Sequence, residues 1–293
     1  MFPYDKKGEF SMLIAWVCAI ALAGALGICA AVDAFAGLTW LWLLPVCLFG
    51  SILLLAACWF LLLVIMAKAV DMTEDQDKDS LFYRGVTRLT IDALLPILKV
   101  HVEAQGLKQL PKDSRFLLVC NHLHDTDPIV LLWAFPKSQL GFISKRENDT
   151  KFLIGPFLRK LLCQPINREN DREALKTILN CIKLIKEDEI SVGVFPEGYI
   201  RGDNLMHPFR SGVFKIAQKA NVPVVVCTLQ GTQHIYKNMK TWSPSFVKLH
   251  LVGVITPEEQ QGRTAVDIAH EAYQMMAHDL GPDLVFSETA ENT

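Results

Sequence analysis

Two long uncharged segments near the N-terminus constrain this chain more than any other feature. Residues 12–32 contain no charged side chain, and after a single aspartate the run 34–67 is again uncharged. A helix needs about 20 apolar residues to cross a hydrocarbon core about 30 Å thick. The pattern predicts a transmembrane helical hairpin over residues 1–70, and a hairpin lying in one leaflet is the alternative. A cleavable signal peptide is not expected, because the first apolar run is too long and a second one follows it.

The charges that flank the two segments predict their orientation. Lys6 and Lys7 precede the first segment, Lys68 follows the second, and the connection between them has no Lys or Arg. By the positive-inside rule both ends face the cytoplasm, which places the rest of the chain on the cytoplasmic face of a membrane. Four of the eight cysteines lie in the hairpin and none forms a C-x-x-C pair. Scattered reduced thiols are therefore expected, and neither a disulfide framework nor a zinc site.

The remainder of the chain alternates between helical and extended patterns. Residues 71–79 form an acidic linker, residues 80–282 a folded domain, and residues 283–293 a disordered tail. Alternation of this kind predicts an α/β sheet covered by helices. The expected helices are 80–99, 128–134, 151–162, 171–187 and 265–280, and the expected strands are 100–104, 115–120, 140–144, 191–195, 222–227 and 246–255.

The segment Asn121-His-Leu-His-Asp-Thr-Asp-Pro128 carries the clearest chemical signal. It follows an apolar strand and precedes an apolar helix, and Asp127 before Pro128 fits an N-cap with proline at the first helical position. A turn between strand and helix lets the Asp127 carboxylate fold back onto the His122 imidazole. A histidine held by a carboxylate is able to take a proton from a substrate hydroxyl directly, so that no enzyme nucleophile is needed.

Two other interpretations of this segment remain open. In the first, Asp127 only caps its helix and His122 is a polar loop residue. In the second, His122 and His124 begin a metal site. A metallohydrolase motif of the form H-x-H-x-D-H would need Asp at position 126 and His at position 127, where this chain has Thr126 and Asp127. No H-E-x-x-H pair occurs elsewhere, so we expect no metal.

A second polar loop follows another apolar strand at Phe195-Pro-Glu-Gly198. Pro196 ends the hydrogen bonding of the strand, and Gly198 permits backbone conformations closed to other residues. Alone this is an ordinary loop opening. It is nevertheless a second polar loop at the end of a second strand, and open α/β sheets bind ligands outside the carboxyl ends of their strands. The two loops together therefore indicate a ligand-binding site.

The charge distribution bears on the partners of the chain. The net charge is −2, so no global basic field would recruit nucleic acid. Residues 137–172 nevertheless carry eight Lys or Arg against four Asp or Glu, which suits an anionic membrane surface or a phosphorylated substrate. A solvated helix face beside apolar residues is the alternative for this patch.

Together these motifs resemble those of the PlsC-like glycerolipid acyltransferase family, which includes 1-acyl-sn-glycerol-3-phosphate acyltransferases. The N-H-x4-D motif of that family falls on Asn121, His122 and Asp127, and its F-P-E-G motif on Phe195 to Gly198. Its arginine-ending motif is similar to 165–168, with a Lys145-x-Glu147 element upstream, and its V-P-V motif is similar to 222–226. Order and spacing agree over residues 80–257.

The resemblance implies a helix-covered mixed sheet and the transfer of a fatty acyl group to the sn-2 hydroxyl of lysophosphatidic acid. It implies that His122 is the general base and that Asp127 orients it. No metal or other cofactor is implied; acyl-CoA or acyl-carrier protein would be the co-substrate, a lysophospholipid the acceptor, and membrane lipids the surroundings. The substrate-binding residues that it implies are Lys145, Arg168, Glu197, Gly198 and Arg201, with Arg168 as a bidentate phosphate ligand and Glu197 positioning the acceptor and its arginines.

Three departures from the family pattern bear on the acceptor headgroup. His124 stands where serine is frequent, Pro165 and Asn167 replace two residues of the second motif, and Arg201 lies one position later than usual, after Tyr199. The alternatives are acyl transfer to another lysophospholipid or to glycerol 3-phosphate, a lipid hydrolase, and a non-catalytic lipid-binding membrane protein. The hydrolase is disfavoured because a G-x-S-x-G nucleophile motif is absent.

Overall fold

The computed structural model of this chain describes residues 7–74, 76–167 and 170–286. These fall into two compact units, and the boundary between them in the sequence lies between Asp71 and Met72. Unit 1 holds the apolar N-terminal segments, and unit 2 holds all of the strands in the described part of the chain.

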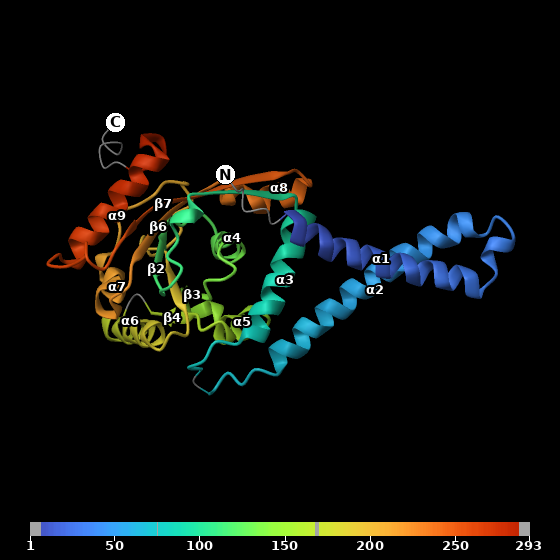
Figure 1. Cartoon of the computed structure of the whole chain (residues 1–293), viewed down its shortest axis with the longest axis horizontal. Coiled ribbons are helices and arrows are strands. Elements are labelled where there is room, and N and C mark those ends of the chain that lie inside the picture. The colour runs from blue at the N-terminus through green and yellow to red at the C-terminus, as the bar shows by residue number, and fades with distance from the viewer. Residues whose placement is uncertain (1–6, 75, 168–169, 287–293) are drawn as a thin grey trace. The chain divides into compact units, whose positions relative to one another are not determined.

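Unit 1 is a pair of helices, α1 (Lys7–Ala31) and α2 (Trp40–Lys68), joined by a short turn that contains the 3₁₀ helix η1 (Ala34–Ala36). Figure 1 shows the two helices packed side by side. The side of α1 that is buried is lined by the small residues Ala21, Ala25 and Cys29, at most 1% exposed. Small residues at this four-residue spacing allow two helices to approach closely, as membrane helices do. Both helices are long and apolar enough to cross a membrane, so the chain has the helices that a transmembrane hairpin requires.

Unit 2 is built on one seven-stranded sheet with the strand order β1-β7-β6-β2-β5-β3-β4. All neighbouring strands are parallel except β6 and β7, which are antiparallel, so the sheet is mixed. The strands are β1 (Val100–Gln105), β2 (Leu117–Cys120), β3 (Leu140–Lys145), β4 (Gln164–Ile166), β5 (Ser191–Val194), β6 (Val224–Gln230) and β7 (Ser245–Ile255).

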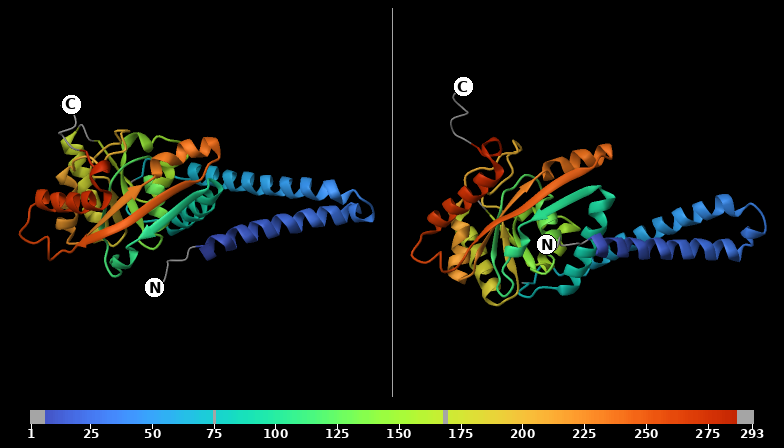
Figure 2. Two further views of the ribbon diagram at one scale, coloured as in Figure 1. Left: turned by 90° about the horizontal axis from the view of Figure 1, so that it is seen from above. Right: turned by 45° about the horizontal axis from the view of Figure 1, so that its top comes forward.

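Helices cover both faces of this sheet, which Figure 2 shows from two further directions. The central strands are buried on both sides, so that Leu117 belongs to one apolar core and Leu118 to the other. One core is closed by α6 (Asp171–Lys186), α7 (Lys215–Ala220) and α9 (Ala265–Leu280). The other is closed by α3 (Leu81–Ile97), α4 (Asp127–Ala134) and α8 (Ile235–Thr241), while α5 (Ile154–Lys160) follows β3 and packs against α3.

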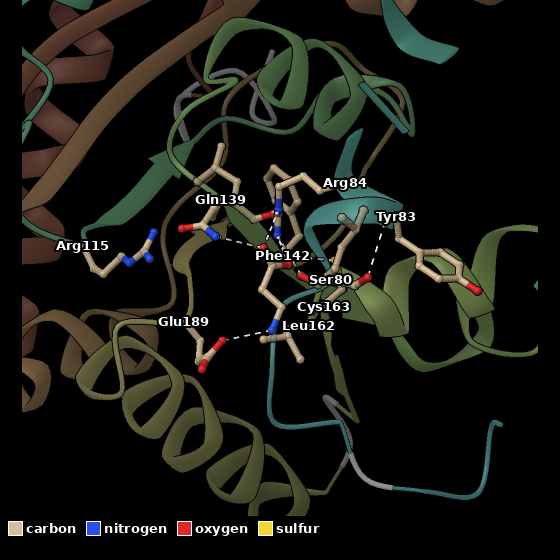
Figure 3. A network of polar contacts seen from close by, with 12 residues as sticks. Ser80, Tyr83, Arg84, Arg115, Gln139, Phe142, Leu162, Cys163 and Glu189 are labelled. Atoms are coloured by element: carbon tan, nitrogen blue, oxygen red, sulfur yellow. Dashed lines mark hydrogen bonds and ion pairs between the residues drawn. The ribbon is translucent and has the colours of Figure 1, made fainter. Parts of the chain in front are cut away.

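The last residue of the linker, Asp79, is held to the rest of unit 2 by a buried polar network (Figure 3). The Asp79 carboxylate accepts two hydrogen bonds from the Arg84 guanidinium, at 2.7 and 2.8 Å. Arg84 also donates to the carbonyl oxygen of Leu140 at 2.9 Å, and the Asp79 N–H donates to the Glu189 carboxylate at 3.0 Å. The start of α3 is therefore fixed to the beginning of β3 and to the turn before β5.

The expected helices and strands are all present, with ends that differ by up to three residues. The sequence analysis missed β4, α7 and α8. β4 is only three residues long and contains a proline, and α7 and α8 are too short for a clear helical period. Residues 283–286 of the expected tail are ordered: Val285 forms a bridge with Met206, and the tail proper, 287–293, lies outside the described residues.

Candidate active site

The carboxyl ends of β2 and β5 lie side by side and present the two polar loops together. These strands pair in parallel with Val119 opposite Val194, so the loops that begin at Asn121 and Phe195 leave the sheet at nearly the same level. The Asn121 side chain is buried and forms two hydrogen bonds with the backbone of Leu229 in β6, donating to O at 2.9 Å and accepting from N at 2.7 Å. Asn121 thus ties the first loop to β6, the strand on the other side of β2.

His122 and Asp127 form the side-chain pair that the motif predicts. The Nδ1 atom of His122 lies 2.8 Å from Oδ2 of Asp127, and the imidazole is 14% exposed. Because a carboxylate accepts hydrogen bonds, this contact places the proton on Nδ1 and leaves Nε2 as the acceptor. The pair has the geometry of a general base and the group that orients it.

The contacts of Asp127 correct the expected capping arrangement. The N-cap of α4 is Thr126, so that Asp127 and Pro128 occupy the first two helical positions. Oδ2 of Asp127 accepts the backbone N–H groups of Leu123 and His124, at 2.7 and 2.9 Å, in addition to the imidazole. The carboxylate is fully buried, and its described hydrogen bonds all go to the loop that carries His122. It therefore shapes that loop as well as orienting the imidazole.

The imidazole of His122 rests on a stack of aromatic rings. The Phe195 ring lies 4.0 Å from it between centroids, at 15°, and Phe142 of β3 lies 6.0 Å beyond Phe195 at 9°. Gly193 of β5 makes room for this stack, since a Cβ atom there would lie 2.4 Å from the Phe142 ring. The motif phenylalanine thereby limits the orientations open to the His122 side chain.

Glu197 joins three segments of the chain at the site. Its Oε1 accepts the N–H of His122 at 2.7 Å, and its Oε2 accepts the N–H of His207 at 2.9 Å. The expectation was that Glu197 positions the acceptor and its arginines, yet these two described hydrogen bonds are both with backbone. Burial raises its pKa to about 7, although the two N–H groups act in the opposite direction.

Gly198 and the arginines near it form the outer side of the second loop. Gly198 has a φ of +92°, and a Cβ atom there would lie 3.0 Å from Nε of Arg210. The guanidinium of Arg201 lies over the Tyr199 ring at 4.9 Å and donates to its hydroxyl at 2.7 Å, and Arg210 lies 5.8 Å from the same ring. Two exposed guanidinium groups therefore flank this loop, and Arg210 has no motif in the sequence that would have identified it.

Lys145 and the expected arginine motif meet at the neighbouring strand ends. Lys145 is exposed at the end of β3 and pairs in register with Ile166 of β4. Arg168, two residues further on, lies outside the described residues. The register brings the start of the arginine motif beside Lys145, at the same edge of the sheet as His122.

Neither a reactive thiol nor a cluster of metal ligands accompanies His122 in the described part of the chain. Cys120 immediately precedes the motif, but burial raises the pKa of its thiol well above the usual value, so it remains protonated. Among the described residues, no three His, Cys, Asp or Glu side chains are grouped so that they could hold a metal ion. Nδ1 of His124 lies 3.1 Å from the Thr126 hydroxyl.

Comparison with family models matches two parts of the chain. A model described as Acyltransferase matches residues 101–230, which include every described residue discussed in this site. A second model, described as the Pycsar effector protein domain, matches residues 10–117, which include α2 and all but the first three residues of α1.

Individual proteins resemble the same region. The 1-acyl-sn-glycerol-3-phosphate acyltransferase of Bacillus subtilis (strain 168) is 34% identical over 142 residues, covering 48% of this chain and 69% of the relative. A chloroplastic 1-acyl-sn-glycerol-3-phosphate acyltransferase of Brassica napus is 32% identical over 189 residues, covering 64% of this chain and 53% of the relative. The chain thus spans about two thirds of the length of the bacterial relative and about half of the plant one.

A solved structure shows the same fold. The crystal structure of the 1-acyl-sn-glycerophosphate acyltransferase PlsC from Thermotoga maritima superposes with a TM-score of 0.52 and 20% identity. The match covers 80% of this chain and 96% of the other. It confirms the predicted helix-covered mixed sheet.

Proposed function

This chain belongs to the PlsC-like glycerolipid acyltransferase family, and from that membership we propose that it moves a fatty acyl group from a thioester to the sn-2 hydroxyl of lysophosphatidic acid. The product is phosphatidic acid. The observation that carries the proposal is the His122–Asp127 pair at 2.8 Å, placed where β2 ends beside the F-P-E-G loop. Relatives whose names state this activity cover the same region.

The proposed reaction uses His122 twice. Nε2 takes the proton of the acceptor hydroxyl while the hydroxyl oxygen attacks the thioester carbonyl carbon. The carbon–sulfur bond then breaks, and the proton on Nε2 passes to the departing thiolate. Asp127 holds Nδ1–H throughout and stabilises the imidazolium that forms between the two transfers.

The residues around the pair have proposed roles that follow from their charge and place. Lys145 and Arg201, with Arg168, would bind the acceptor phosphate, and Arg210 adds a cation that the sequence motifs do not contain. Glu197 and Gly198 shape the second polar loop. Glu197 fixes the backbone of His122, and Gly198 leaves room for the Arg210 side chain. Alignment of two amphiphiles at a membrane supplies a large share of the rate enhancement.

The proposed location follows from unit 1. Its two helices are suited to membrane insertion, and we propose that the chain ends of the hairpin and the whole of unit 2 lie on the cytoplasmic side. The acyl donor would be acyl-CoA or acyl-carrier protein, both of which present a thioester in the cytoplasm.

The test is acyl transfer to labelled lysophosphatidic acid by purified membranes that contain either the natural chain or His122→Ala. We expect labelled phosphatidic acid from the natural chain and a loss of about 10²–10⁴-fold in the variant. Each donor is supplied separately, and lysophosphatidylglycerol and glycerol 3-phosphate are tested as alternative acceptors. Fatty acid released without an acceptor would indicate a hydrolase, and no product with any donor and acceptor would contradict the proposal.

A further inference from the structure

The exposed aromatic side chains of unit 2 concentrate at the edge of the sheet that carries His122. Of the six such side chains in the described part of unit 2, five lie at this edge and only Phe82 does not. The topology explains the grouping, because β3, β5 and β6 end at this edge and β7, which is antiparallel to β6, begins there. The five are Phe152, Tyr199, Tyr236, Trp242 and Phe246.

Two of these aromatic residues form a cluster with lysines at and beside α8, which we call the α8 surface: Lys99, Tyr236, Lys237, Lys240 and Trp242. Phe246 is not part of it, because Phe246 alternates along β7 with Val247, which packs in the same core as α8, and so projects from the other face of the sheet, where it stacks on His101. The ammonium group of Lys99 lies 4.9 Å from the Trp242 ring centre and donates to the Trp242 carbonyl oxygen at 3.0 Å. Lys240 lies 4.4 Å from the Tyr236 ring centre. Trp242 is 61% exposed and Tyr236 53% exposed, so each leaves a large apolar area in contact with water.

The charge of the α8 surface has a single sign. Residues 231–248 contain no Asp or Glu and three lysines. Lys248 lies opposite Glu103 of β1 in register, so we do not include it in the α8 surface. The other two, Lys237 and Lys240, have no acidic residue on their own helix. Figure 1 shows α8 at the end of the sheet, near the end of α3 from which Lys99 follows.

The α8 surface is also connected to the catalytic loop. The Tyr236 ring stacks with the imidazole of His124 at 6.4 Å. The backbone N–H of His124 in turn donates to Asp127 at 2.9 Å. A ligand that covers the α8 surface would therefore lie next to the loop that orients His122.

We propose that the α8 surface binds the anionic interface of a lipid bilayer and so turns the edge of the sheet with His122 toward the membrane. Trp and Tyr rings favour the level of the headgroups, and lysines beside them attract anionic lipids. Large exposed rings together with lysines that form no ion pair among the described residues fit this interface, where apolar and charged groups are both satisfied. The inference rests on the proposed function, since an enzyme that acts on a lysophospholipid gains from a site that opens at the lipid surface.

The test is hydrogen–deuterium exchange of the full chain in lipid nanodiscs of phosphatidylcholine, with and without phosphatidylglycerol. We expect slower exchange of the amides in 234–248 when phosphatidylglycerol is present. This protection should be lost in Lys237→Glu/Lys240→Glu and reduced in Trp242→Ala. Equal exchange in the two kinds of nanodisc would overturn the proposal.

Lys215→Glu/Lys219→Glu is the matched control, because it reverses two exposed lysines of α7, which leads into β6 from the opposite edge of the sheet. It should leave the protection of 234–248 unchanged. Protection that requires acyl-carrier protein and occurs without phosphatidylglycerol would assign the surface to that protein and overturn the lipid proposal. The exchange measurement does not depend on enzymatic turnover. Absence of acyl transfer would therefore contradict the proposed function, whereas absence of the protection by phosphatidylglycerol would contradict the membrane-binding proposal.

Discussion

The backbone N–H of His122 donates to Oε1 of Glu197 at 2.7 Å, although the two residues lie 75 positions apart in the chain. The second oxygen of the same carboxylate accepts the N–H of His207 at 2.9 Å. One buried side chain therefore joins the ends of β2 and β5 to the loop that carries His207. The position of the His122 backbone depends on this carboxylate, while the orientation of its ring depends on Asp127 and Phe195.

Replacement of Asp127 by Asn should remove most of the activity and leave the fold intact. An amide oxygen still accepts the N–H groups of Leu123 and His124, but it no longer stabilises an imidazolium at His122. We expect kcat for acyl transfer to fall about 10²–10⁴-fold with a small change in KM. Asp125→Asn, an exposed carboxylate two residues away, is the control and should behave as the natural chain. Equal effects of the two variants would contradict the assigned role of Asp127.

Glu197 should make the stability of unit 2 depend on pH in a defined direction. Burial raises its pKa from 4.5 to about 7, so the folded state binds a proton more tightly than the unfolded state. A group of this kind stabilises the fold below its unfolded pKa, and the stabilisation is lost as the pH rises through the folded pKa. The free energy of unfolding should therefore fall between pH 4.5 and about 7, by at most on the order of 3 kcal/mol.

Thermal unfolding in detergent micelles, measured across this pH range for the natural chain and Glu197→Gln, checks the prediction. Gln has no proton to lose in this range, so the stability of Glu197→Gln should not show this fall between pH 4.5 and about 7. Parallel curves for the two proteins would show that Glu197 does not change its ionisation between the folded and unfolded states.

Gly193→Ala should disturb His122 from a distance. The added Cβ would lie 2.4 Å from the Phe142 ring, which must then move against Phe195 and thereby against the imidazole. Overpacking of this kind costs about 1–3 kcal/mol of stability, and we expect kcat to fall as well. The double variant Gly193→Ala/Phe142→Leu should recover part of the lost stability and part of the lost kcat. Gly212→Ala is the control, since a Cβ atom added there would meet no atom within 4 Å apart from the adjoining backbone.

The sequence could predict the His122–Asp127 pair because the two residues stand at the ends of one short loop between an apolar strand and an apolar helix. It could predict the position of the F-P-E-G loop for the same reason. The motifs did not contain Arg210 or His207, because these residues reach the site through a segment without regular structure, and their distances to Gly198 and Glu197 depend on the folded chain.

The helix-covered mixed sheet was predictable from alternation and from the resemblance, but β4 was not. A three-residue strand that contains Pro165 has neither the length nor the period of a strand. It forms because β3 offers a free edge and the tertiary contacts of α6 hold it there. The partners of Glu197 were also unpredictable, since a carboxylate in a loop gives no indication that it will be buried against backbone N–H groups.

Phe286→Ala should weaken the site from the C-terminal side. The Phe286 ring stacks on His207 at 4.7 Å, and its N–H donates to the Met206 carbonyl oxygen at 3.0 Å. Since the His207 N–H holds Glu197, loss of the ring should loosen this contact and lower kcat several-fold, with a loss of stability of about 1 kcal/mol. Leu179→Ala, an exposed apolar residue of α6, is the control. An unchanged kcat in Phe286→Ala would show that the C-terminal segment does not support the site.

The Asp79–Arg84 pair should be the strongest single polar contribution to the attachment of the linker. Asp79 is 2% exposed and Arg84 12%, so that Arg84→Met leaves a buried carboxylate without its main partner. Breaking one half of such a pair costs about 3–5 kcal/mol, and Arg84→Met/Asp79→Leu should recover a large part because no charge is then left buried. The control is Arg88→Met, which removes an ion pair with Asp92 on the more exposed side of α3 and should cost at most about 1 kcal/mol. The measurement is thermal unfolding of the natural chain, Arg84→Met, Arg84→Met/Asp79→Leu and Arg88→Met. If Arg84→Met and Arg88→Met lose the same stability, the buried network does not hold the start of α3 to β3, and the contacts of α3 with the apolar core are then sufficient.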